Sequence, residues 1–112
     1  ISLNLPLNSF TKNLLGDNEF NLMKEGIVIV NTARAELINL EVLLNNLNSN
    51  KIRGYLTDVL ENEPIIDNHP LLKFNNVIIT PHIGSRNYET VARQGSQAVK
   101  NIFSYLKDFN HE

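Results

Sequence analysis

The sequence predicts an α/β fold, in which helices cover a parallel β-sheet. Two uninterrupted runs of mainly apolar residues, Ile27–Val30 and Val77–Thr80, are typical of strands buried inside such a sheet. Elsewhere, apolar residues recur at spacings of three and four, which is the period of an amphipathic helix. Strand-like and helix-like segments alternate with short links, and this order favours parallel strands joined by helical crossovers.

The first predicted elements are short. The segment Ile1–Pro6 alternates apolar and polar residues, and we expect it to be the end of a strand because a proline has no N–H for a continuing ladder. A short helix should follow, with Asp17 as its N-cap and Gly26 closing it. The run Ile27–Val30 then forms a strand buried on both faces.

The middle of the chain predicts a helix and two more strands. Asn39 can cap a helix of roughly ten residues, whose apolar stripe is Leu40, Leu43, Leu44 and Leu47. Gly54–Val59 is the third strand, with a weaker pattern than the second. After a turn-rich stretch, Val77–Thr80 is the fourth strand, and Pro81 stops it.

The last element is the clearest helix. Its apolar positions follow the helical period over most of the segment, and they are Tyr88, Val91, Ala92, Ala98, Val99, Ile102, Phe103 and Leu106. We expect this stripe, like the leucines of the preceding helix, to pack in the core.

Composition excludes several functional classes. The 112 residues are 42% hydrophobic, which suits one compact domain, and the chain opens with Ile1 as a piece of a longer protein would. The net charge of -2, without a block of like charge, argues against nucleic acid or a membrane surface as a partner. The absence of cysteine excludes disulfides and thiol nucleophiles, and no metal site is expected. With no membrane-length apolar run and no visible signal peptide, we expect a cytoplasmic protein.

Polar residues follow the predicted strands at the sheet edge where ligands bind in parallel sheets. Arg34 follows the second strand, Asp58 ends the third with Glu63 just beyond, and His82 follows the fourth. Arginine can bind a carboxylate through two hydrogen bonds, and histidine can exchange a proton near neutral pH. This trio suits the reduction of a keto acid, but surface salt bridges give the same pattern.

Three motifs carry a family resemblance. The chain contains NTAR at 31–34, DVLENEP at 58–64 and TPHIG at 80–84. In this order and at this spacing, they resemble the motifs of the D-isomer-specific 2-hydroxyacid dehydrogenases. The resemblance implies the second half of a doubly wound parallel (Rossmann-like) sheet with a long C-terminal helix. Residues 1–84 would be the C-terminal part of the dinucleotide-binding domain, and residues 85–112 a helix returning toward a substrate domain that the chain lacks.

The resemblance also implies catalytic roles. Arg34 would bind the carboxylate and keto oxygen of a small 2-oxo or 2-hydroxy acid. His82 would donate the proton in reduction and accept it in oxidation, while Glu63 would pair with His82 and favour its protonated form. Asp58 would contact the carboxamide or ribose of NAD.

The other cofactor contacts implied by the resemblance come from the same motifs. They are Thr32, Ala33, Arg34 and the segment His82, Ile83, Gly84 and Ser85. Ser85 would either touch the cofactor or cap the last helix. NAD is the implied cofactor, and NADP stays open because the chain lacks both the glycine-rich phosphate turn and the acidic residue that recognises the ribose.

The chain departs from the family pattern at three positions. Ala35 stands where the family usually has glycine, and alanine would cost about 1 kcal/mol if that position needed a positive φ. Asn4 stands where histidine is common, and Thr57 is more polar than usual.

The implied activity is hydride transfer between a nicotinamide and the α-carbon of a 2-oxo or 2-hydroxy acid, in an enzyme expected to be a homodimer. Two alternatives remain. A corepressor-like protein that senses NAD(H) would bind NADH yet reduce keto acids poorly. A non-catalytic truncated remnant, which lacks the pyrophosphate turn, would bind NAD weakly or not at all. We expect the 112 residues to be inactive on their own.

Overall fold

The computed structural model describes residues 1–109, with side chains described to residue 107. The last three residues of the predicted 85–112 segment therefore lie outside the described part. The chain divides into two compact units, one of residues 1–82 and one from Ile83 onward. The first unit contains a four-stranded sheet and the second contains one long helix.

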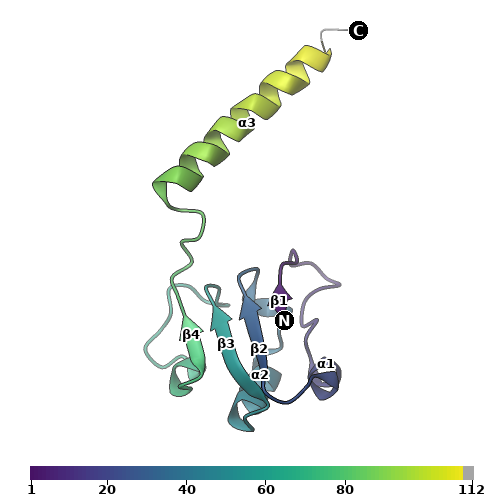
Figure 1. The fold of residues 1–112 in the computed structure, drawn as a ribbon, viewed down its shortest axis with the longest axis vertical. Coiled ribbons are helices and arrows are strands. Elements are labelled where there is room, and N and C mark those ends of the chain that lie inside the picture. The colour runs from purple at the N-terminus through teal and green to yellow at the C-terminus, as the bar shows by residue number, and fades with distance from the viewer. Residues whose placement is uncertain (110–112) are drawn as a thin grey trace. The chain divides into compact units, whose positions relative to one another are not determined.

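All strand pairs of the sheet are parallel, which confirms the predicted α/β fold (Figure 1). In spatial order the strands are β1 (Ser2–Leu3), β2 (Ile27–Asn31), β3 (Ile52–Thr57) and β4 (Val77–Ile79). Their final residues lie in register across the sheet, in the row Leu3, Asn31, Thr57 and Ile79. The loops that follow the strands consequently all leave from one edge, which is the edge where the candidate residues lie.

The structure corrects the bounds of all four predicted strands. β1 is shorter than the predicted segment Ile1–Pro6, and β2 extends one residue beyond the predicted end at Val30. β3 begins at Ile52, before the predicted start at Gly54, and ends before Asp58. The charged neighbours of Ile52 hide this start in the sequence, but the Arg53 side chain is exposed and so can extend a strand without being buried. β4 ends before Thr80, although the Thr80 N–H still donates to the Thr57 carbonyl at 2.9 Å.

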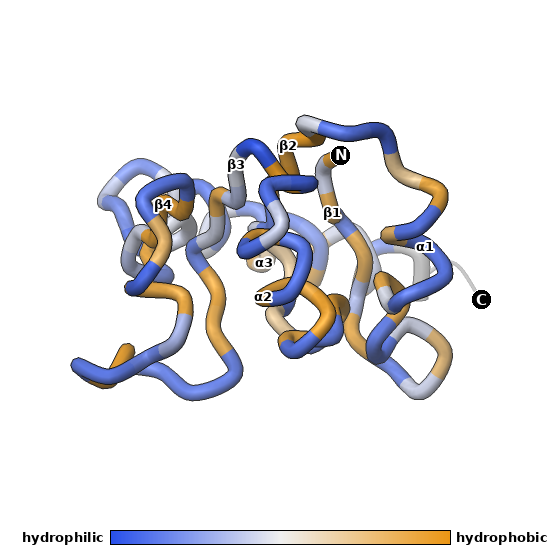
Figure 2. The backbone as a smooth tube through the Cα atoms, turned by 90° about the horizontal axis from the view of Figure 1, so that it is seen from below, coloured by the Kyte–Doolittle hydropathy of each residue, from blue (hydrophilic) through white to orange (hydrophobic). Residues whose placement is uncertain are grey.

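The helix between β2 and β3 forms as predicted. It is α2 (Leu40–Asn48), and the Asn39 side chain accepts a hydrogen bond from the Val42 N–H at 3.1 Å. Its apolar residues pack with the strands into the core, and Figure 2 shows apolar colouring on much of α2 and β2. The largest fully buried core side chains are Tyr55, Phe20, Ile29, Leu37, Ile38, Leu43, Leu47 and Ile52.

The predicted ends of the first helix, α1 (Asp17–Leu22), were wrong. Gly16 is its N-cap, and the Gly16 N–H donates to the Glu19 carboxylate at 3.0 Å. Asp17 is therefore the first helical residue, where a negative charge still suits the helix dipole. The helix ends at Leu22, and Gly26 lies beyond it, in the turn before β2, with φ at +74°.

The two faces of the sheet differ in burial. Ile29 and Tyr55 are buried with α1 and α2 in the core. On the opposite face Val28 is half-buried, and Ile78 is 57% exposed. The expectation that Ile27–Val30 is buried on both faces is therefore wrong for one face, because the helices of this unit cover only the other.

The second unit is dominated by α3 (Tyr88–Phe109), a helix of 22 residues as predicted. Its N-cap is Asn87, whose side chain accepts from the Thr90 N–H at 2.7 Å, and not Ser85. Within this unit taken by itself the apolar stripe is exposed, with Val99 at 52% and Phe103 at 62%. The helical period defines an apolar face but supplies no surface to bury it. Among the described residues, no helix is long and apolar enough to span a membrane.

Candidate active site

The structure brings Glu63 and His82 together at the carboxyl edge of the sheet. His82 Nδ1 lies 3.0 Å from Glu63 Oε2 and 3.3 Å from Glu63 Oε1. Glu63 Oε1 also accepts a hydrogen bond from the Leu60 N–H at 2.9 Å. Both side chains are partly exposed, at 43% for His82 and 38% for Glu63, so the pair is accessible from solvent.

The contacts around Glu63 favour its ionised form. The Leu60 N–H, the hydrogen bond to His82 and the positive charges of His82 and Arg34 hold the pKa of Glu63 below its ordinary value of 4.5, against a smaller opposing effect of burial. The contribution of Arg34 is the smallest of these and acts through its charge, not through a hydrogen bond. Arg34, Glu63 and His82 lie at the same edge of the sheet because each follows the carboxyl end of a parallel strand.

We predict that Glu63 titrates below pH 4.5. Because its folded-state pKa is lowered, the ionised Glu63 carboxylate contributes stability that is fully present above pH 4.5 and is lost as the pH falls through the lowered value. The carboxyl carbon shift of Glu63, followed by NMR against pH, gives the midpoint. In a His82→Ala variant the midpoint should rise but stay below 4.5, because the Leu60 hydrogen bond remains. A parent midpoint at or above 4.5 would contradict this.

The loop that carries Arg34 is held by Asn31, at the end of β2. The Asn31 Oδ1 accepts from the Ala33 N–H at 3.1 Å, and its Nδ2 donates to the Arg34 carbonyl at 2.9 Å. The Arg34 Nη1 donates to the Ala33 carbonyl at 2.6 Å. Ala35 begins the short 3₁₀ helix η1 (Ala35–Leu37) without a positive φ, so the strain considered for alanine at this position does not arise.

A pocket of about 520 Å³ lies beside this loop. Its lining residues are Asn4, Leu5, Pro6, Leu7, Thr32, Ala33 and Arg34. They come from the segments that follow β1 and β2, and the Thr11 hydroxyl holds the first of these segments by donating to the Pro6 carbonyl at 2.7 Å. Asn4, at the position where the family commonly has histidine, is part of this lining. Three residues of the NTAR motif, Thr32, Ala33 and Arg34, therefore line a pocket at the carboxyl edge.

Asp58 has an oxygen that the protein leaves unpaired. Its Oδ1 is buried and has no hydrogen-bond partner among the described residues. Leaving such an acceptor unsatisfied costs about 1–3 kcal/mol, so a buried unpaired oxygen needs an explanation. A ligand that carries an amide or hydroxyl donor would satisfy it, and the nicotinamide ribose and carboxamide both carry such donors.

The remaining predicted cofactor residues, Ile83, Gly84 and Ser85, begin the second unit, and all three are exposed. Within the part of the chain that the structure describes, no group of three or more metal-ligating side chains could hold a metal ion.

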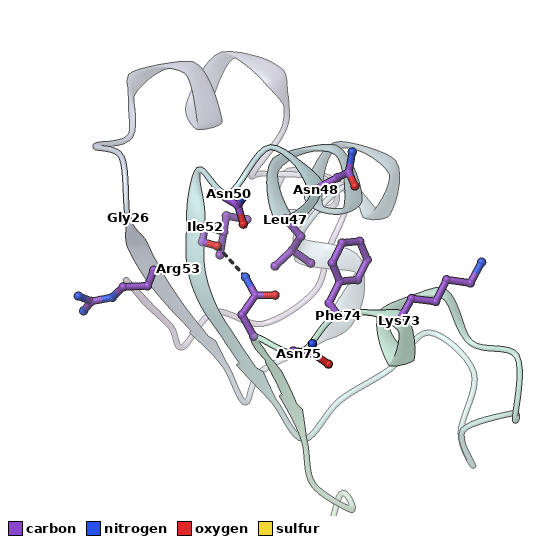
Figure 3. Close-up of a pocket in the computed structure, with 10 residues that line it drawn as sticks. Gly26, Leu47, Asn48, Asn50, Ile52, Arg53, Lys73, Phe74 and Asn75 are labelled. Carbon is purple, nitrogen blue, oxygen red and sulfur yellow. Dashed lines mark hydrogen bonds between the residues drawn. The ribbon is translucent and has the colours of Figure 1, made fainter.

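A larger pocket, of about 670 Å³, lies at the opposite edge of the sheet (Figure 3). It is lined near the beginnings of β3 and β4 by Ile52, Phe74 and Asn76, among others. Figure 3 shows the side chains of Arg53 and Lys73 extending to opposite sides. Ligands of parallel sheets bind at the carboxyl ends of the strands, so size alone does not make this pocket the site.

Three features of the site were not predicted from the sequence. They are the turn held by the Asn31 side chain, the hydrogen bond from the Leu60 N–H to Glu63, and the contacts of the Thr57 hydroxyl. An asparagine followed by a short polar stretch is a known signal for a side-chain turn, so the first could be found from sequence. The other two depend on tertiary contacts, for which the sequence carries no signal.

Comparison with known proteins supports the family resemblance that the three sequence motifs indicated. Residues 1–84 match the family described as D-isomer specific 2-hydroxyacid dehydrogenase, NAD binding domain. A 4-methyl-2-oxopentanoate reductase A of Aspergillus oryzae is 47% identical over 90 residues, which are 80% of this chain and 27% of that protein.

Solved structures of similar proteins support the same family. A glyoxylate reductase from Paecilomyes thermophila has a TM-score of 0.80 and 41% identity, covering 92% of this chain and 31% of that one. An acyclic imino acid reductase, Bsp5, in complex with NADPH and D-arginine, has a TM-score of 0.80 and 34% identity, covering 96% and 34%. The chain thus spans about a third of the length of the proteins it matches. Its motifs, its sheet and these similarities show that the chain belongs to the D-isomer specific 2-hydroxyacid dehydrogenase family and represents part of the NAD-binding domain.

Proposed function

We propose that the protein carrying this chain is an NAD-dependent D-2-hydroxyacid dehydrogenase that reduces a small 2-oxo acid. The observation that carries the proposal is the Glu63–His82 pair at 3.0 Å, on the sheet edge where Arg34 lines a pocket. These groups supply what the reaction needs besides hydride, namely a cation for the substrate carboxylate and a proton donor.

The chemistry of Arg34, Glu63 and His82 supports a role for each of them. Arg34 binds the carboxylate and the keto oxygen of the substrate, because its guanidinium offers paired donors of fixed charge. Glu63 engages His82 Nδ1, which leaves Nε2 to donate a proton to the keto oxygen during reduction and to accept it during oxidation. When bound, the nicotinamide supplies or accepts the hydride.

The proposed cofactor site lies at the same carboxyl edge of the sheet. Asp58 accepts a hydrogen bond from the nicotinamide carboxamide or its ribose, which explains the unpaired Oδ1. Thr32 and Ala33 line the same pocket as Arg34. Ile83, Gly84 and Ser85 are proposed as further cofactor contacts on the strength of the TPHIG motif and its continuation.

The architecture of the whole protein is also a proposal. Residues 1–84 would form the second half of the dinucleotide-binding domain, and the helix within 85–112 would lead toward a substrate domain. We propose a homodimer, and NAD rather than NADP as the preferred cofactor.

Turnover tests the proposed function. The protein that carries this chain should consume NADH in the presence of glyoxylate or 4-methyl-2-oxopentanoate, and NADPH in the same assay ranks the two cofactors. Binding of NADH without turnover of any 2-oxo acid would favour a sensing protein instead. Failure to bind either cofactor would indicate a non-catalytic remnant, and each of these two results would overturn the proposal.

A further inference from the structure

Thr57, the last residue of β3, connects the loops that carry the candidate site residues. Its hydroxyl oxygen lies 2.9 Å from the Asn31 carbonyl, across the sheet on β2. The same oxygen lies 2.9 Å from the Val59 carbonyl and accepts from the Val59 N–H at 3.1 Å. One hydroxyl therefore joins the end of β2 to the turn that contains Asp58.

The Thr57 backbone extends this connection to the third loop. Its carbonyl accepts from the Thr80 N–H at 2.9 Å, two residues before His82. On the other side, Asn31 continues the connection through its side chain to the Ala33 N–H and the Arg34 carbonyl. The backbone link to Thr80 survives any side-chain substitution, whereas the link to Asn31 through the hydroxyl does not.

This contact network is buried. Thr57 is 3% exposed and Asn31 is fully buried. Burial raises the pKa of the neighbouring Tyr55 hydroxyl, while hydrogen bonds with the side chains of Thr57 and Asn31 act in the opposite direction, so the three polar groups share one interior site. Buried hydrogen bonds of this kind hold groups in a single arrangement because a broken bond leaves unsatisfied polar atoms.

We propose that Thr57 is a positioning residue whose hydroxyl sets the spacing between the Arg34 loop and the Asp58 turn. Thr57 itself does not touch the substrate in this proposal, which rests on the proposed function for its effect on turnover. Small displacements of binding groups lower rates strongly, so the loss of one such hydrogen bond should be visible in the kinetics.

Paired substitutions test the role in the full protein. Thr57→Val removes the hydroxyl with little change in shape, and the KM for the 2-oxo acid and the Kd for NADH should each rise about tenfold. Thr57→Ser keeps the hydroxyl and should restore both values to near those of the parent. The pH profile of kcat should not move, because the hydroxyl does not contact the Glu63–His82 pair.

The matched control breaks a similar bond at the other end of the same strand. The Asn76 Nδ2 donates to the Ile52 carbonyl at 2.9 Å, the dashed line in Figure 3. Asn76→Ala should lower Tm, as Thr57→Val does, without changing KM or Kd below the melting range. If both variants change the binding constants equally, or if Thr57→Val changes only Tm, Thr57 is merely structural and the proposal fails.

A second measurement does not depend on turnover. Amide hydrogen exchange at Ala33, whose N–H is held by Asn31, should become faster in Thr57→Val and stay unchanged in Asn76→Ala. If the parent protein neither binds NADH nor reduces 2-oxo acids, the proposed function fails, but this exchange still tests the connection. Unchanged exchange at Ala33 in Thr57→Val would overturn the positioning role.

Discussion

Replacing His82 with alanine is expected to lower kcat for the reduction of a 2-oxo acid by about 10²–10⁴-fold, the usual contribution of a positioned general acid. The reason is that the imidazole, held through Nδ1 by Glu63 at 3.0 Å, is the proposed proton donor at this edge. Steady-state kinetics with NADH and a responsive 2-oxo acid provide the measurement. Glu63→Gln should lower kcat by less than His82→Ala, because it leaves the imidazole in place while removing the charge that orients it.

The matched control for His82 is His69. The His69 Nδ1 accepts from the Leu71 N–H at 3.3 Å, at the start of the short helix η2 (Pro70–Lys73). His69→Asn keeps a side-chain acceptor for this helix and should leave kcat unchanged. Equal losses of kcat in His69→Asn and His82→Ala would show that general damage to the fold, and not loss of the proton donor, explains the effect.

Replacing Arg34 with glutamine is expected to lower kcat/KM for the 2-oxo acid by about 10²-fold or more. The proposed contact consists of two hydrogen bonds from a charged group, each worth about 1.5–3 kcal/mol, and the substitution removes both. Arg34→Lys keeps the charge but not the paired donors, and it should fall between the parent and Arg34→Gln. Initial rates over a range of 2-oxo acid concentrations measure the effect.

The control for Arg34 is Arg53, an exposed arginine near the start of β3, at the far edge of the sheet. Arg53→Gln should leave kcat/KM within about twofold of the parent, as is usual for substitutions of surface residues away from a site. A KM for the 2-oxo acid that does not change in Arg34→Gln would rule out the proposed carboxylate contact.

Much of the local structure follows from local patterns. The helix after Asn39 has the predicted cap, and the strands around Ile29 and Ile78 coincide closely with the apolar runs. These features depend on residues close together in the chain, so periodicity and capping chemistry are enough to predict them. The ends of α1 and β3 were predicted less well. The N-terminus of α1 depends on a hydrogen bond between Glu19 and Gly16, and the start of β3 includes the exposed, charged Arg53. Both features leave only weak local signals in the sequence.

The sequence by itself determined the α/β fold, the long final helix, the three motifs and the edge on which they lie, since each depends on short stretches of chain and on the polarity of parallel strands. Tertiary structure alone decided which groups meet. Glu63 and His82 are 19 residues apart, and Thr57 and Asn31 are 26 apart. Their contacts exist because the register aligns Asn31 with Thr57 and Thr57 with Ile79. Side-chain burial was likewise a tertiary result, because an apolar face is buried only where another surface covers it.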